Sequence, residues 1–154
     1  MATQVEVSTN VRESGALTQG RQSLDRSVWY NGSLMTFLVR GEDTEGQFAL
    51  IEAVNRKGNG PPRHIHHRED ETFYVVEGEV TVSVGDRTIN AKPGTLVFLP
   101  RGIPHTFTIE SEQARMLVLV TPSGLEGWFK EYSQIQEMLA AAAGFRLEFL
   151  LPNK

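Results

Sequence analysis

The sequence contains no cysteine, no long hydrophobic run and no excess of positive charge. Without cysteine, the chain forms no disulfide and offers no thiolate to a metal ion. Its N-terminal region lacks the apolar core of a signal peptide, and no run is long enough to cross a bilayer. A net charge of −4 leaves no basic surface for phosphate groups. We therefore expect a cytoplasmic protein that binds neither membranes nor nucleic acid.

The composition is typical of one globular domain. The chain has 154 residues, of which 40% are hydrophobic and 22% are charged, and it shows no internal repeat. Residues 1–27 are polar and fit either a partly ordered arm or a strand that pairs with another subunit, and we favour the arm. We expect a barrel over residues 28–121, and a helix and tail packed on the barrel over residues 122–154.

Short β-prone runs separated by glycine and proline occupy the middle of the chain. Gly85 and Asp86 fit a two-residue hairpin turn, because glycine tolerates the positive φ that such turns require. Turn signals every 8–12 residues predict an all-β sandwich or barrel. We expect strands over residues 34–39, 47–55, 72–76, 80–84, 88–91, 96–99, 105–109 and 115–120. Alternation along two of these strands places six side chains in the interior, namely Glu71, Phe73, Val75, His105, Phe107 and Ile109.

The C-terminal pattern differs and predicts a helix. Ser123 and Glu126 have the spacing of a capping box, in which the serine accepts from the Glu126 amide and the carboxylate reaches back. Gly144 can end the helix. We expect its aromatic stripe to pack on the barrel or cover its mouth, with contact to a partner as the alternative. The apolar residues at helical spacing are Leu125, Trp128, Phe129, Tyr132, Ile135 and Leu139.

Two histidines and a glutamate lie close together in the sequence. His64 and His66 are two residues apart, so in a strand their imidazoles project from one face, roughly 6 to 7 Å apart, and can share a metal ion. Glu71 follows five residues later, which would place it on the opposite face of a continuous strand. Residues 67–70 must therefore bend or bulge if Glu71 is to join the histidines. His105 follows a loop rich in proline and glycine and is a candidate fourth ligand.

These two segments resemble the paired motifs of the cupin superfamily. The first motif runs from a glycine through His-x-His and a glutamate to a second glycine. Its anchors in this chain are Gly58, His64, His66, Glu71 and Gly78. The second motif matches at Gly94, Pro100, Gly102 and His105, whereas Ile109 stands where the family has asparagine. The resemblance covers residues 34–121. It implies a cupin β-barrel, also called a double-stranded β-helix or jelly roll, with one metal ion held by the two histidines of the first motif, its glutamate and the histidine of the second.

A solvated histidine-rich loop is the alternative interpretation of His64, His66 and His67. Alternation turns His67 away from His66, so we do not expect His67 to be a ligand. Glu69 and Asp70 are expected to be solvated turn residues.

Inside the expected barrel, three apolar residues are candidates for a substrate pocket. Phe73 and Phe107 lie on the same faces as Glu71 and His105, and Ile109 makes the pocket floor more apolar than asparagine would. Ordinary core packing is the alternative for the two phenylalanines, and both roles are compatible.

Three nitrogen ligands and one oxygen ligand, without sulfur, suit Fe, Mn, Ni, Co, Cu or Zn. We therefore expect one divalent transition metal ion per chain, of an identity that the pattern does not select. Octahedral coordination would leave two positions for substrate or dioxygen. Glu71 is the candidate general base, because a carboxylate ligand that detaches can take a proton.

Within the superfamily, segments spread over residues 34–131 are similar to small single-domain cupins that are quercetin 2,3-dioxygenase-like. That resemblance implies a metal that holds an enol or flavonol oxygen while O₂ attacks the ring, with Glu71 as ligand and base. Two alternatives are a non-catalytic cupin that binds a small molecule and a metal-dependent isomerase or lyase that needs no O₂. We also expect a homodimer, as in many cupins.

Overall fold

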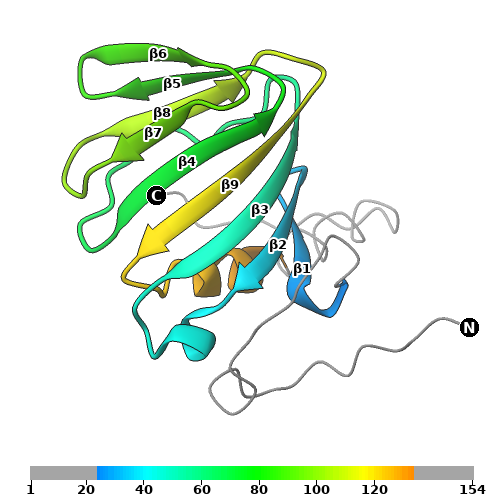
Figure 1. Cartoon of the computed structure of the whole chain (residues 1–154), viewed down its shortest axis with the longest axis vertical. Helices are drawn as coiled ribbons and strands as arrows, with labels where there is room; N and C mark the ends of the chain where they lie inside the picture. The colour runs from blue at the N-terminus through cyan, green and yellow to red at the C-terminus, as the bar shows by residue number, and fades with distance from the viewer. Residues whose placement is uncertain (1–23, 134–154) are drawn as a thin grey trace, which may run out of the picture.

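The computed structural model describes residues 24–133, which form two antiparallel sheets and a helix on the C-terminal side of them (Figure 1). The larger sheet has the strand order β1-β2-β3-β9-β4-β7, and the smaller sheet has the order β6-β5-β8. The elements are η1 (Leu24–Arg26), β1 (Ser27–Tyr30), β2 (Ser33–Val39), η2 (Gly41–Thr44), β3 (Ala49–Arg56), β4 (Asp70–Glu77), β5 (Val80–Val84), β6 (Arg87–Ala91), β7 (Leu96–Leu99), β8 (His105–Ile109), β9 (Gln113–Thr121) and a helix over residues 126–133. The prediction of an all-β barrel with a C-terminal helix is confirmed.

The inner faces of the two sheets form the hydrophobic core. Alternation along β9 is regular, with every second side chain from Ala114 to Val120 buried. The same alternation buries Glu71, Phe73 and Val75 on β4, as expected from the sequence. Burying each large apolar side chain contributes roughly 1.5 to 3 kcal/mol to stability. The core therefore holds the two sheets together.

Strand β9 lies at the centre of the larger sheet. It pairs with β3 on one side, where Asn55 lies opposite Ala114, and with β4 on the other, where Glu71 lies opposite Val120. In Figure 1, β9 runs between β3 and β4 across the middle of the sheet. The β9 residue opposite a residue of β3 or β4 therefore gives the position of that residue along the length of the sheet, which we call its level.

The tight turns agree with the residues that occupy them. Gly85, with φ of 55°, joins β5 to β6, and Val84 pairs with Arg87, so the expected two-residue hairpin is present. Asn31 and Gly32, with φ of 48° and 75°, join β1 to β2 in the same way. Left-handed backbone of this kind favours asparagine and glycine.

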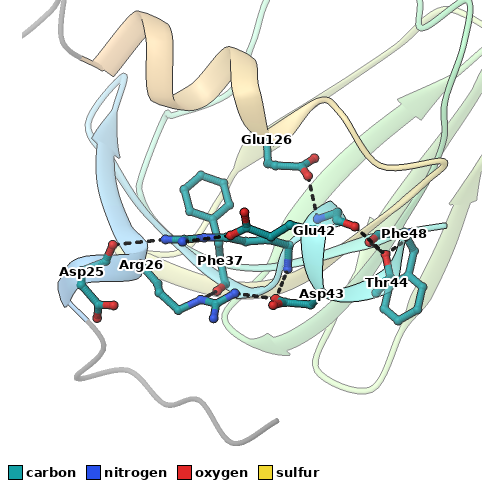
Figure 2. Close-up of polar contacts among 10 residues, drawn as sticks. Asp25, Arg26, Phe37, Glu42, Asp43, Thr44, Phe48 and Glu126 are labelled. Carbon is teal, nitrogen blue, oxygen red and sulfur yellow. Dashed lines mark hydrogen bonds and ion pairs between the residues drawn. The ribbon is translucent and has the colours of Figure 1, made fainter. Parts of the chain in front are cut away.

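The described residues include the last part of the expected N-terminal arm, residues 24–27. Arg26 is buried, forms an ion pair with Asp43 and donates from Nε to the Phe37 carbonyl at 3.0 Å (Figure 2). Ser27 is the first residue of β1. These long-range partners, which sequence spacing does not reveal, hold residues 24–27 against β2 and η2. Residues 1–23, which include most of the expected arm, lie outside the described part of the chain.

The C-terminal helix begins at residue 126, and Glu126 attaches it to η2. The Glu126 carboxylate accepts from the Gly41 amide at 2.9 Å, a contact drawn in Figure 2, and from the Gly124 amide at 2.7 Å. The Ser123 amide donates instead to the Gly46 carbonyl at 3.1 Å. The Glu126 carboxylate thus accepts from the first amide of η2 rather than from the Ser123 amide that the expected capping box requires. The expected end of the helix at Gly144 lies outside the described residues.

Within residues 24–133, no helix is long and apolar enough to cross a membrane.

Candidate metal centre

Three segments of the chain bring together four side chains that could hold a metal ion. His64 forms an isolated bridge with His105, in which the His64 amide donates to the His105 carbonyl at 3.0 Å and the reverse bond measures 2.9 Å. His105 is the first residue of β8, and Glu71 is the second residue of β4. One ligand atom from each of His64, His66, Glu71 and His105 lies within 4.8 Å of all the others.

The bend that the sequence requires between His66 and Glu71 is present. Residues 67 and 68 form a bend before β4 starts at Asp70. The His66 carbonyl accepts from the Gly102 amide at 2.8 Å, which ties this segment to the loop before β8. His67 is exposed and lies outside the cluster.

The outer nitrogens of two histidines bond to backbone carbonyls. His64 Nδ1 lies 2.8 Å from the Pro62 carbonyl, and His105 Nδ1 lies 3.2 Å from the Ile103 carbonyl. Since a carbonyl only accepts, each Nδ1 carries a hydrogen, and in the neutral ring the Nε2 lone pair then faces the cluster. Bonds of this type orient histidine ligands in metal sites.

The inner atoms of the cluster fit a cation. His64 Nε2 lies 3.2 Å from His66 Nε2, and His105 Nε2 lies 3.2 Å from Glu71 Oε2. His105 Nε2 is buried and has no hydrogen-bond partner among the described residues. With no proton between them, nitrogen lone pairs and a carboxylate oxygen at these distances repel one another, and a bound metal ion would remove that repulsion.

The pKa of His66 favours the ligating form. Burial lowers the pKa of His66 below its usual 6.5, against the opposing effects of the Glu71 and Glu69 carboxylates. His66 is therefore neutral near pH 7 and can bind a metal without first losing a proton.

Glu69 is not the solvated residue that the sequence suggests, and Asp70, although partly exposed to solvent, is the first residue of β4 rather than a turn residue. The Glu69 side chain is largely buried, with Oε2 3.8 Å from His66 Nδ1 and Oε1 3.5 Å from Arg68. Asp70 accepts three hydrogen bonds from Arg101. Sequence reasoning missed both because their partners depend on the bend and on a distant loop.

A cavity of about 580 Å³ adjoins the cluster. Its wall includes His64, His66 and Glu71, together with Phe73 and Phe107, whose rings meet edge to face with centroids 5.4 Å apart. Ile109, the third expected pocket residue, is 1% exposed and belongs to the hydrophobic core rather than to the cavity wall. The prediction that Ile109 faces the interior is correct, but Ile109 lies farther along β8 than the residues that line the cavity.

The helix and β1 complete the wall. Trp128 and Phe129 line the cavity with Tyr30. The Trp128 indole donates to the Tyr30 hydroxyl at 3.1 Å, and Tyr30 contacts Phe129 edge to face with centroids 5.1 Å apart. The expected packing of the aromatic stripe on the barrel is thus observed for these residues, whereas Ile135 and Leu139 lie outside the described part of the chain.

Comparison with known proteins identifies the family. The pattern of the cupin domain matches residues 50–121, which contain all four residues of the cluster. The chain belongs to the cupin superfamily. This cupin is 28% identical to quercetin 2,3-dioxygenase of Bacillus subtilis over 58% of its own length and 26% of that protein. It therefore spans about a quarter of the length of that relative.

This cupin matches two further proteins over a larger share of their length. An uncharacterized protein of Streptomyces coelicolor is 32% identical over 60% of this cupin and 82% of that protein. Among solved structures, ectoine synthase from P. lautus superposes with a TM-score of 0.61 at 20% identity, over 70% of this cupin and 78% of that chain. At this identity the similarity supports the fold alone.

Proposed function

We propose that this cupin holds one divalent transition metal ion through His64, His66, Glu71 and His105. The metal would be Fe, Mn, Ni, Co, Cu or Zn, which three nitrogens and one oxygen suit. We further propose that it is a dioxygenase acting on a flavonol-like or other enol or dicarbonyl small molecule with O₂. The observation that carries this proposal is the convergence of four ligand atoms within 4.8 Å beside a largely apolar cavity of about 580 Å³. The similarity to quercetin 2,3-dioxygenases supports the choice of substrate class.

Each part of the site has a role in such a reaction. When bound, the metal would supply a positive charge that stabilises an enolate and, for each of these metals except Zn, a redox centre for O₂. Glu71, the carboxylate of the cluster, takes the proton of the substrate enol on a carboxylate oxygen. The edge-to-face pair of Phe73 and Phe107 borders the same cavity, excludes water and orients a flat ring beside Glu71.

The test has two steps. Elemental analysis of protein purified without an affinity tag or chelator should find about one transition metal ion per chain. The metal-loaded protein should then consume O₂ with a flavonol, and Glu71→Gln should lower kcat far more than His67→Ala, which changes an exposed residue outside the cluster. Turnover that continues without O₂ would support an isomerase or lyase instead. Metal-dependent binding without turnover would support a non-catalytic binding protein.

We propose in addition that the chain forms a homodimer through the outer face of β4 and β7. Tyr74, Leu96 and Phe98 are 41%, 61% and 55% exposed there, and Tyr74 pairs directly with Leu96. These three side chains carry no charge, so the patch can face a second copy of itself without repulsion, as a two-fold interface requires. Light scattering should give the mass of a dimer for the wild type and of a monomer for Leu96→Glu. A monomeric wild type at high concentration would contradict the proposal.

A further inference from the structure

The cavity contains a second polar region, away from the metal cluster. Asn55 on β3 and Ser33 at the start of β2 line the same cavity as His64, His66 and Glu71. Asn55 lies at the level of Ala114 on β9, whereas Glu71 lies at the level of Val120. Six residues of strand correspond to about 20 Å along the strand. The cavity thus extends between two polar ends.

A chain of hydrogen bonds from Asn59 through Ser33 orients the Asn55 side chain. Asn59 Nδ2 donates to the Asn31 carbonyl at 3.1 Å and to Ser33 Oγ at 3.3 Å. Because the carbonyl only accepts, the orientation of the Asn59 amide is determined. Ser33 Oγ accepts from Asn59 and therefore donates its own hydrogen to Asn55 Oδ1, at 2.7 Å. The oxygen of the Asn55 amide is used within the protein.

The nitrogen of that amide is left weakly bonded. Asn55 Nδ2 donates to the Ala53 carbonyl at 3.4 Å, which is long for a hydrogen bond. Asn55 is 2% exposed, and the wall around it includes Met35, Ala53 and Met116. A buried amide hydrogen among apolar side chains gains most from an acceptor that a ligand brings into the cavity. In a cavity with an apolar wall, the small number of polar groups determines which ligand binds.

We propose that Asn55 determines substrate specificity by donating a hydrogen bond to an acceptor oxygen at the end of the substrate remote from the enol. The substrate class is then an elongated, mostly apolar ring molecule with an enol at one end and a hydroxyl, ether or carbonyl oxygen at the other. Ser33 and Asn59 are positioning residues that hold the Asn55 amide with its nitrogen available to the ligand. This inference rests on the proposed function, because the enol end is assigned to the metal cluster.

The test compares two ligands in the metal-loaded protein without O₂, by isothermal titration calorimetry. The probes are two 3-hydroxyflavones that carry a straight chain of about eight atoms at the 4′ position, one ending in a methyl group and the other in a hydroxyl, so that the terminal oxygen can reach a group about 20 Å from the enol. The wild type should bind the hydroxyl-terminated compound about tenfold more tightly, because a protein group made to bond an oxygen is left unpaired without it. Asn55→Leu should bind the two compounds equally, and a circular dichroism spectrum like that of the wild type would show that the variant is folded.

Two further variants complete the design. Ser33→Ala removes the hydroxyl that orients Asn55 and should reduce the preference severalfold, which provides a test if Asn55→Leu does not fold. Asn90→Leu, an exposed asparagine on β6, should leave the preference unchanged. An unchanged preference in Asn55→Leu and Ser33→Ala would overturn the role of Asn55 while leaving the proposed function intact. If the wild type binds neither flavonol, both proposals are overturned.

Discussion

Asp70 and Arg101 form a bidentate ion pair that joins the start of β4 to the loop before β8. Arg101 Nη2 lies 2.7 Å from Asp70 Oδ2, and Arg101 Nε and the Arg101 amide lie 3.1 and 2.9 Å from Oδ1. Asp70 precedes Glu71 directly, and the loop that carries Arg101 ends at His105. The pair therefore holds the segments that carry Glu71 and His105, two residues of the candidate metal cluster, in place relative to each other.

This ion pair should make stability depend on acid pH. The hydrogen bonds from Arg101 lower the pKa of Asp70 from 3.8 to about 2. Because the folded state holds the charged form, the contribution of Asp70 is fully present above about pH 4 and is lost as the pH falls through about 2. Urea unfolding should show wild type more stable than Asp70→Asn above that range and a shrinking difference below it. Asp86→Asn, in the exposed β5–β6 turn, is the control for loss of one carboxylate. A difference that does not depend on pH would argue against the ion pair.

Removing a histidine of the cluster should remove the metal. His64→Ala and His105→Ala each delete one of four converging ligand atoms, so we expect both variants to be purified with little bound metal. His67→Ala should keep the wild-type metal content, because His67 is exposed and lies outside the cluster. Elemental analysis of the three proteins checks this. Equal metal loss in His67→Ala and His64→Ala would refute the ligand assignment.

Glu69 should strengthen metal binding without contacting the ion. Its carboxylate lies 3.8 Å from His66 Nδ1 on the outer side of the imidazole, where its charge favours the orientation that presents Nε2. Loss of a hydrogen-bonded outer partner costs about 10- to 100-fold in metal affinity, and a carboxylate at 3.8 Å should give an effect at the lower end, about tenfold. We expect Glu69→Gln to show a decrease of that size in a competition titration with a chelator. Glu110→Gln, an exposed residue after β8, should bind as tightly as the wild type, and an equal loss in both variants would point to a general charge effect.

Glu126 should contribute to stability through the two amides that it caps. In Glu126→Ala the Gly41 and Gly124 amides lose their acceptor, and the buried Gly41 donor, left unsatisfied, costs about 1 to 3 kcal/mol, whereas the exposed Gly124 amide can bond water. We therefore expect the free energy of unfolding to fall by about 1 to 3 kcal/mol. Glu131→Ala, at an exposed position of the same helix, should change it little. Similar values for both variants in denaturant titrations would show that the cap is unimportant.

Much of the barrel and the four-residue cluster could be predicted because they depend on local patterns. Alternation along a strand determines which side chains share a face, and it placed Glu71 with Phe73 on the inner side of β4. The odd spacing between His66 and Glu71 required a bend, and the chain bends at residues 67 and 68. Both inferences use only the period of a strand and the spacing of residues.

The missed features depend on contacts between distant segments. The Glu126 carboxylate caps the Gly41 amide, 85 positions away in the sequence. Asn55 in the cavity is oriented by Ser33, which lies on another strand. Such pairs follow from the packed structure, and no local spacing indicates them. Ile109 was misplaced for a related reason, since alternation gives the face of a strand but not where along it a cavity ends.

The two tryptophans of the chain occupy contrasting environments. Trp29 is 52% exposed and lies outside the cavity wall, whereas Trp128 lines the cavity, donates to Tyr30 and stacks on Tyr132 with ring centroids 3.9 Å apart. Replacing Trp29 with phenylalanine would leave Trp128 as the single indole fluorophore. Its emission would then serve as a built-in optical signal of cavity occupancy, readable without a label and without turnover.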